Sequence, residues 1–265
     1  MTPEEIDEAA EALFAAEHLN NQIGLLSARY PEMTMEDAYA VQATFVARKI
    51  ATGRRRIGWK IGLTSRAMQD ALGIDTPDSG VLLDDMLFED GAQIPPGRFI
   101  QPRVEAEIAF VMKDDLSGKA LTREDVLAAT DYVAPALEIL DTRILRKDAE
   151  GRVRNVCDTI SDNAANAGLV LGSARHAPEA HDLRWVGAIV RRDETVEETG
   201  LGAGVLNDPV TSVLWLAERL NRYGQQIAAG DIVLSGSFIR PVEAPAGADF
   251  FADFGPFGTV TVTFD

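Results

Sequence analysis

Two glutamates, Glu105 and Glu107, lie two positions apart in a run over residues 102–112 that alternates between apolar and other residues. Alternation with a period of two is typical of a half-buried β-strand, and it places both carboxylates on one face, roughly 7 Å apart at their Cα atoms. A second short apolar run, 132–141, carries another acid, Glu138. Three carboxylates without a nearby His or Cys are the ligands that a hard cation such as Mg²⁺ prefers. The spacing therefore favours a site for a divalent cation.

The alternative for the glutamate pair is a solvated strand face that carries two ordinary acids. Ala109 and Val111 continue the face on which Glu105 and Glu107 lie, and they argue that this face is covered. Carboxylates on a covered face repel each other and need a partner. The residues alone leave both interpretations open.

Lys60 lies between two large apolar residues in a strand-like run, 57–64, that contains two glycines. Glycines in a strand usually mark a bulge or a close approach of the backbone to another group. A lysine at such a position either serves chemistry or is an edge-strand lysine whose amine reaches water. Asp78 follows in the turn-rich loop 75–80, where an aspartate often serves only the turn, although loops also carry function.

Composition restricts the class of protein. The chain has 265 residues, of which 46% are hydrophobic, enough for one large domain. Its net charge of −17 argues against nucleic acid or an anionic membrane as a partner, so an anionic substrate requires locally placed cations. The single cysteine, Cys157, excludes an intramolecular disulfide and suits a reducing cytoplasm. There is no signal-peptide pattern or apolar run of membrane-spanning length, and the three histidines lack metal-ligand spacing.

Capping residues and helical spacing predict an N-terminal helical layer over residues 1–53, which we interpret as structural. Thr2 and Thr34 are the expected N-caps, each followed three residues later by an acid. The apolar spacing predicts that the first helix continues toward Tyr30.

The remaining chain, 54–265, has no linker or repeat, and we expect it to form one compact catalytic unit. Helices are predicted over 65–72, 122–131 and 209–222. A hairpin around 255–258 leads into a last alternating strand.

Two polar segments could support a site. Segment 143–154 is basic in an acidic chain, and such a segment is either a solvated loop or faces an anionic ligand. Residues 158–166 are dense in hydrogen-bonding side chains that could orient metal ligands. Ser235 to Ser237 is not a nucleophile elbow, because the flanking glycine pattern and a suitable His are absent.

Several stretches together resemble the fumarylacetoacetate hydrolase superfamily, within it the hydratase/decarboxylase branch. They are GWKIGLTSRAMQ, DSGVLLDDM, PRVEAEIAF, PALEILDTR, DTISDNAANAG and SGSFIRPVEAPAG. The stretches span nearly the whole chain and are specific when taken together. The resemblance implies an α+β fold, a mixed, mostly antiparallel curled β-roll with packed helices and an N-terminal helical layer.

The resemblance also implies roles for single residues. The ligands of Mg²⁺ or Mn²⁺ map to Glu105, Glu107 and Glu138, and the acid–base groups map to Lys60 and Asp78. A base with a pKa near neutrality must move the protons, and a desolvated lysine can reach that range. The contacts to the 2-oxo acid end of a substrate map to the backbone of Leu83, to Ser161, and to the turn of Ser235, Gly236 and Ser237.

The activity implied is that of a carbon–oxygen lyase of aromatic catabolism, a cytoplasmic homo-oligomer, often a pentamer of dimers, that adds water to an unsaturated 2-oxo acid. The long segment between Asp141 and Asp158 favours a seven-carbon dioate, as in 4-hydroxyphenylacetate degradation. Hydration of a five-carbon dienoate and decarboxylation of a six-carbon 2-oxo dioate are the nearest alternatives. Acylpyruvate hydrolysis and a non-catalytic role as partner of a decarboxylase are more distant ones.

A seven-carbon dioate bound through its 2-oxo acid end carries a second carboxylate several ångströms from the metal. In an acidic protein that carboxylate needs a local cation, and arginine suits it because its planar fork can pair both oxygens. The candidates are Arg66, Arg143, Arg146, Arg152 and Arg154.

Overall fold

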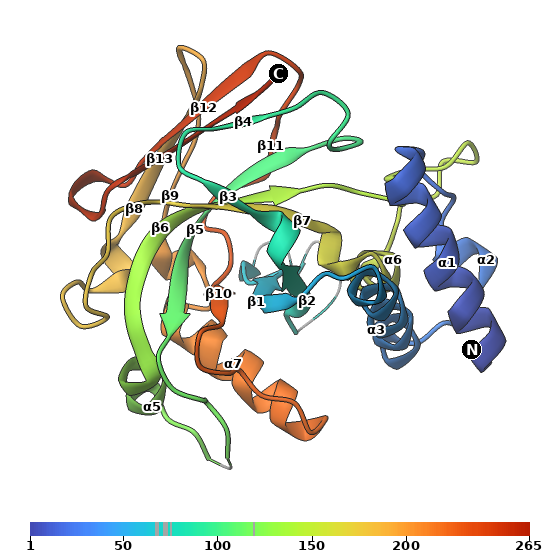
Figure 1. Ribbon diagram of the computed structural model, residues 1–265, viewed down its shortest axis with the longest axis horizontal. Helices are drawn as coiled ribbons and strands as arrows, with labels where there is room; N and C mark the ends of the chain where they lie inside the picture. The colour runs from blue at the N-terminus through green and yellow to red at the C-terminus, as the bar shows by residue number, and fades with distance from the viewer. Residues whose placement is uncertain (67–68, 71–73, 75, 119) are drawn as a thin grey trace.

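Two β-sheets form the centre of the computed structural model, which describes residues 1–265 except 67–68, 71–73, 75 and 119 (Figure 1). The strands of the larger, eight-stranded sheet are β1 (Arg56–Gly62), β2 (Asp78–Leu83), β3 (Leu87–Glu89), β5 (Arg103–Met112), β6 (Thr130–Leu140), β7 (Asn166–Leu171), β10 (Ile232–Leu234) and β11 (Val242–Glu243). Their order is β2-β1-β10-β5-β6-β7-β3, and β11 pairs with β5.

The second sheet has five strands and forms the other wall of the fold (Figure 1). Its strands are β4 (Ala92–Ile94), β8 (Gly187–Arg192), β9 (Thr195–Leu201), β12 (Ala248–Asp253) and β13 (Thr259–Phe264), in the order β4-β13-β12-β8-β9. Parallel pairing is confined to β1–β10, β3–β7 and β4–β13 among the described strands, and neither sheet closes into a barrel. The predicted α+β class with a mixed, mostly antiparallel roll is confirmed.

Strands β5 and β6 pair antiparallel over their whole length and are drawn as long curved arrows in Figure 1. The predicted alternation in β5 is confirmed, because Val104, Ala106 and Ile108 lie in the large core between sheets and helices. The opposite face is also covered, since Ala109 packs with buried residues of the neighbouring strands. A solvated face for the glutamate pair is thereby ruled out.

The N-terminal helices are α1 (Pro3–Leu19), α2 (Leu26–Arg29) and α3 (Met35–Ala51), which lie together on one flank (Figure 1). Thr2 and Thr34 cap α1 and α3 through the expected capping boxes. The predicted continuation of the first helix toward Tyr30 is wrong, because Asn20 adopts a left-handed conformation with φ 49° that ends α1.

In the part of the chain that the structure describes, three further helices are α5 (Arg123–Ala129), α6 (Val156–Ser161) and α7 (Pro209–Arg222), and 3₁₀ turns cover Asp84–Met86, Asn163–Ala165, Leu183–Trp185, Gly202–Gly204 and Gly255–Phe257. The helices predicted over 122–131 and 209–222 and the hairpin around 255–258 are confirmed. Much of the helix predicted over 65–72 lies outside the described residues. None of the helices in the described part of the chain has the length and apolar character needed to cross a membrane.

Asp78 to Gly80 belong to strand β2, so the loop predicted there is wrong at its end. Pairing with β1 decides the conformation, since Asp78 lies opposite Gly62 and Gly80 lies opposite Lys60. Helix α3 supports this strand from the other side, because the Gln42 amide donates to the Ser79 carbonyl at 2.8 Å.

Candidate functional site

The three predicted metal ligands converge. Glu105 on β5 lies directly opposite Glu138 on β6, and Glu107 follows two residues along the same face. One carboxylate oxygen from each residue lies within 4.8 Å of the others. The side chains of Glu107 and Glu138 are completely buried, and Glu105 is partly buried. The paired strands therefore gather three negative charges at one buried point.

Hydrogen bonds within the described residues satisfy these buried carboxylates only in part. Glu107 Oε1 and both oxygens of Glu138 have no well-oriented hydrogen-bond donor among the described residues. Burial raises the pKa of Glu105 to about 8, and the Glu138 carboxylate adds to this effect. Burial and the neighbouring acids also raise the pKa of Glu107, and burial raises the pKa of Glu138. All-oxygen ligands with unsatisfied charge fit a hard divalent cation such as Mg²⁺ or Mn²⁺.

The amide of Gly236 fixes the orientation of Glu107 by donating to its Oε2 at 2.7 Å. Gly236 has φ 114°, and a Cβ at this position would collide with the side chain of Thr64. Glycine is therefore required for this contact. Because the Gly236 amide serves a predicted metal ligand, the geometry gives no support to its predicted substrate contact.

Lys60 reaches the carboxylates from β1, with its Nζ 3.2 Å from Glu138 Oε1. Strands β10 and β5 separate β1 from β6, which corresponds to about 14 Å in a flat sheet. The curl of the sheet therefore brings Lys60 and Glu138 together. Burial lowers the pKa of Lys60, but Glu138, Asp78 and the other acids outweigh it and hold that pKa above its ordinary value. The contacts of Lys60 with the chain therefore give no support to the expected near-neutral pKa and favour a charged amine.

Asp78 is the second predicted acid–base group, and it is buried at the start of β2. Burial raises its pKa, while Lys60 and then Arg154 act in the opposite direction. A Cβ on Gly62, its partner on β1, would collide with the Asp78 carboxylate and lie 3.2 Å from Lys60 Nζ. The glycine two residues after Lys60 therefore leaves room for the Asp78 carboxylate and the Lys60 amine, and sequence reasoning did not assign it this role.

A cavity of about 320 Å³ opens beside the carboxylates. Lys60, Asp78 and Glu105 line it together with Arg154 and Arg240. Its size lies at the lower end of the range for small-molecule sites, about 300–1,000 Å³. The arrangement can hold a divalent cation, present a charged amine, and accept a small anionic molecule.

Of the residues predicted to contact the 2-oxo acid end of a substrate, Ser237 is the one that lines this cavity. Its hydroxyl donates to the carbonyl of Ile239 at 2.9 Å. Leu83 is buried in the core, with its amide directed to Met86 Sδ. The hydroxyls of Ser161 and Ser235 are buried without a hydrogen-bond partner in the described part of the chain. The geometry supports a substrate contact for Ser237 only.

Arg143 is committed to the protein interior. Its Nε donates to the Asp162 carboxylate, and its remaining N–H groups go to the carbonyls of Asp162 and Asn166 and to Glu17. All guanidinium donors are therefore used, which contradicts the predicted contact with a substrate. Asp162, part of the polar segment 158–166, holds Arg143 rather than a metal ligand.

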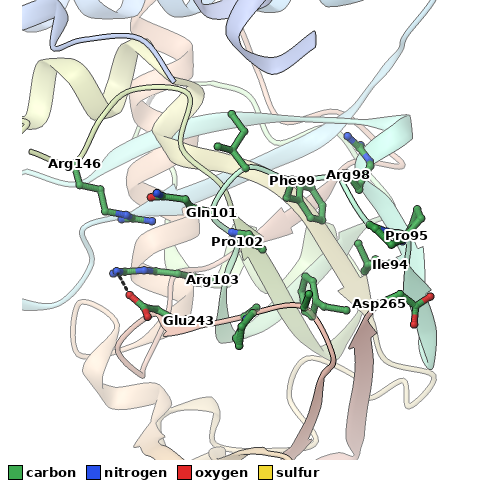
Figure 2. A pocket seen from close by; sticks show the side chains of 17 residues that line it. Ile94, Pro95, Arg98, Phe99, Gln101, Pro102, Arg103, Arg146, Glu243 and Asp265 are labelled. Atoms are coloured by element: carbon green, nitrogen blue, oxygen red, sulfur yellow. Dashed lines mark hydrogen bonds and ion pairs between the residues drawn. The ribbon is translucent and has the colours of Figure 1, made fainter. Parts of the chain in front are cut away.

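The remaining candidate arginines differ in their exposure and in the cavity that they line. Arg152 is exposed and pairs with Asp148 at 2.6 Å, and Arg66 is exposed. Arg146 lines a different cavity of about 520 Å³, on whose wall Arg103 pairs with Glu243 (Figure 2). Arg240, which sequence reasoning missed, also lines the carboxylate cavity. It belongs to the motif SGSFIRPVEAPAG, in which no role was assigned to the arginine.

Fold and site define a class of protein: a curled mixed sheet whose central strands hold a carboxylate cation site beside a buried lysine and a small cavity. No family model matches the chain. The chain is 52% identical over 256 residues to 2-oxo-hept-4-ene-1,7-dioate hydratase of Escherichia coli, a match that covers 96% of each protein. It is 41% identical over 265 residues to 2-keto-4-pentenoate hydratase of Paraburkholderia xenovorans, covering 100% of this chain and 97% of the relative.

A solved structure of 4-oxalocrotonate decarboxylase from Pseudomonas putida G7, complexed with magnesium and adipate, has a TM-score of 0.94 at 34% identity. It covers 100% of this chain and 99% of its own. Fumarylpyruvate hydrolase from Pseudomonas aeruginosa, at 12% identity and a TM-score of 0.59, shares the fold, covering 79% of this chain and 89% of its own. The chain therefore belongs to the family of these hydratases and the related decarboxylase, the branch that its sequence motifs predicted, and it shares the fold of the fumarylpyruvate hydrolase.

Proposed function

We propose that the chain is a metal-dependent hydro-lyase that adds water to 2-oxohept-4-ene-1,7-dioate, giving 4-hydroxy-2-oxoheptane-1,7-dioate, in the breakdown of aromatic compounds such as 4-hydroxyphenylacetate. The observation that carries the proposal is the buried cluster of Glu105, Glu107 and Glu138 with Lys60 at 3.2 Å. The 52% identity to a hydratase of this substrate supports the seven-carbon dioate.

Glu105, Glu107 and Glu138 would hold the Mg²⁺ or Mn²⁺ ion, and the relative bound to magnesium supports this choice. When bound, such an ion acts as a Lewis acid that draws electron density from the 2-oxo group and makes the C3 protons more acidic. The Gly236 amide keeps Glu107 in place, so that the ligand set is preorganised.

The chain's own residues handle protons. Hydration requires that a proton leaves C3, that one is added at C5, that hydroxide from water bonds to C4, and that a proton returns to C3. The net change is the addition of one water. Lys60 lines the cavity as a charged donor and, after giving up a proton, can accept one. The charge of Lys60 favours the ionised form of Asp78, and the Asp78 carboxylate in turn favours the charged form of the amine between these steps.

Decarboxylation of a six-carbon 2-oxo dioate is the second candidate, because the decarboxylase relative matches the fold over the whole chain. Hydration of a five-carbon dienoate is the third, supported by 41% identity to a pentenoate hydratase. C–C bond hydrolysis has less support, since neither His176 nor His181 lines the carboxylate cavity. The two rings are hydrogen-bonded to each other, and His176 also contacts the Phe257 carbonyl.

The test is to incubate the purified chain and Mg²⁺ with each substrate. Loss of substrate is followed by ultraviolet absorbance, the product by NMR, and CO₂ by its release. We expect dioate hydration without CO₂, abolished by EDTA and restored by Mg²⁺. CO₂ release in step with substrate loss would establish the decarboxylase instead. Turnover of none of the three substrates, with metal bound, would support a non-catalytic partner role.

We also propose that the helical layer over residues 1–53 is structural, because every described residue that lines the carboxylate cavity lies between Lys60 and Pro241. A homo-oligomer, with a decamer as the assembly to test, is supported by the preference of such enzymes for closed symmetry and by exposed apolar side chains such as Trp185 and Ile189. Sedimentation at the mass of a 28.7 kDa monomer would refute it. The single free cysteine supports a cytoplasmic location.

A further inference from the structure

The proposed dioate substrate ends in a second carboxylate, and this inference rests on the proposed function. The cavity beside the metal ligands is lined by three cationic side chains: Lys60, Arg154 and Arg240. Each could attract an anion, so the question is which of them is free to do so. The protein has 42 acidic and 25 basic residues, so an uncommitted cation in a cavity is unexpected unless it meets an anion from outside.

Two of the three cations are already engaged. Lys60 pairs with Glu138 within the carboxylate cluster. Arg240 pairs with Glu198 at 2.5 Å, and its side chain is 80% exposed, so water screens its charge. Neither presents an unpaired charge to the cavity.

Arg154 differs from both. Within the described residues, its side chain makes one hydrogen bond, from Nη1 to the hydroxyl of Thr142 at 2.9 Å, and no ion pair with a carboxylate. Burial lowers the pKa of Arg154, which reflects a guanidinium whose charge is poorly compensated. A guanidinium that has lost water without gaining a carboxylate has donors left for a ligand.

The backbone around Arg154 holds the side chain in place. Its amide donates to the Arg146 carbonyl at 3.1 Å, at the base of a small turn. Asn155, the next residue, caps helix α6. Thr142, the partner of the side chain, lies two residues beyond the end of β6, the strand that carries Glu138. Arg154 is therefore positioned by rigid elements relative to the metal ligands, as a specificity contact requires.

We propose that Arg154 binds the carboxylate at the far end of the dioate and so determines the preference for a dicarboxylate over a monocarboxylate 2-oxo acid. The metal ligands and Lys60 take the 2-oxo acid end, and the fork of Arg154 pairs with the oxygens of the other end. Arg146 is excluded from this role because it faces the separate cavity of Figure 2.

The test uses two saturated ligands that cannot be hydrated, 2-oxoheptanedioate and 2-oxoheptanoate, which have the same carbon chain and differ only in the terminal carboxylate. Dissociation constants are measured by calorimetry with Mg²⁺ for the unchanged protein, Arg154→Gln, Arg154→Lys, Arg240→Gln and the control Arg152→Gln. Arg152 lies in the same segment but is exposed and paired with Asp148, so its replacement removes an equal charge away from the cavity. Thermal melting checks that each variant is folded.

We expect Arg154→Gln to weaken binding of the dioate at least about tenfold, as for loss of a charge-assisted pair, and to change binding of the monoacid much less. Arg154→Lys should restore part of the difference, and Arg152→Gln should leave the ratio of the two constants unchanged. Equal weakening of both ligands would overturn the proposal in favour of a structural role, and a shift of the ratio in Arg240→Gln but not in Arg154→Gln would assign the contact to Arg240 instead. Hydration by the unchanged protein is assayed separately, so a wrong activity and a wrong contact are distinguishable.

Discussion

Glu105 and Glu138 lie directly opposite each other on the antiparallel strands β5 and β6. Like charges in such a pair destabilise a sheet, and burial of these two, with Glu107 beside them, adds to the effect. The alternating residues around them stabilise the strands strongly enough to hold this arrangement. The pairing of these strands thus creates an electrostatically unfavourable site, and a divalent cation bound there would offset the repulsion.

The first prediction is that Glu107→Gln loses metal affinity by at least about 10²-fold, since even loss of a residue that only orients a ligand costs 10–100-fold. The amide oxygen of Gln can still accept from the Gly236 amide, so the change removes charge and keeps the packing. Mg²⁺ titration by calorimetry measures the effect. Glu243→Gln, at an exposed acid paired with Arg103, is the control and should bind Mg²⁺ normally. Full turnover of Glu107→Gln in EDTA would contradict a metal site here.

The second prediction concerns pH. The pKa of Glu105 is raised to about 8 in the metal-free fold, above the ordinary value of 4.5. A raised carboxyl pKa means that the folded state binds the proton more tightly than the unfolded state. The stabilising contribution of the protonated Glu105 carboxyl to the free energy of unfolding is therefore present below pH 4.5 and is lost as pH rises toward 8.

Added Mg²⁺ should consequently raise the melting temperature little near pH 5 and increasingly toward pH 8.5, because protons no longer compete for the carboxylates. Melting curves with Mg²⁺ and with EDTA across this range measure the difference. Glu105→Gln should flatten the pH dependence. A stabilisation by Mg²⁺ that is independent of pH would show that the carboxylates do not bind it.

The metal-ligand pair could be predicted from the sequence, because the alternation that places it depends only on neighbouring residues in one strand. The alternation in β5 places Glu105 and Glu107 on one face whatever the rest of the chain does. The pKa of Lys60 could not be predicted, since it depends on Glu138 of a strand brought near by the curl of the sheet.

The arginines of segment 143–154 show the same limit. Arg143 and Arg154 look alike in the sequence, and only contacts with distant residues separate them. Arg143 meets Asp162 and Glu17 in the interior, whereas Arg154 lies beside the cavity. In the same way, pairing with β1 rather than local turn residues made Asp78 part of a strand.

The third prediction is that Lys60→Met lowers turnover by about 10²-fold or more, the usual size of an acid–base contribution. Mg²⁺ affinity should be kept or increased, because the amine that pairs with Glu138 competes with the ion for its charge. Turnover and Mg²⁺ titration of the same preparation test both parts. Lys147→Met, at an exposed lysine, is the control. Unchanged turnover of Lys60→Met would remove Lys60 from the mechanism.

The fourth prediction concerns Gly62. In Gly62→Ala the new methyl group meets the Asp78 carboxylate and Lys60 Nζ, so both groups must shift. Turnover should fall at least about tenfold, since small displacements of catalytic groups reduce rates strongly. Gly24→Ala is the matched control, because a Cβ at Gly24 meets no atom within 4 Å. Equal kinetic constants for the two variants would mean that the positions of Asp78 and Lys60 do not matter for turnover.

The fifth prediction is that Arg143 stabilises the fold and does not contact the substrate. Arg143→Met leaves Asp162, completely buried, without its cation, and breaking such a pair costs about 3–5 kcal/mol. Denaturant unfolding should show this loss, and the double variant Arg143→Met with Asp162→Asn should recover part of it because the orphaned charge is gone. The ratio of dissociation constants for 2-oxoheptanedioate and 2-oxoheptanoate should stay the same in any folded fraction, since all guanidinium donors of Arg143 point to the protein. A stable Arg143→Met protein that no longer prefers the dioate would reverse the assignment and return Arg143 to the substrate.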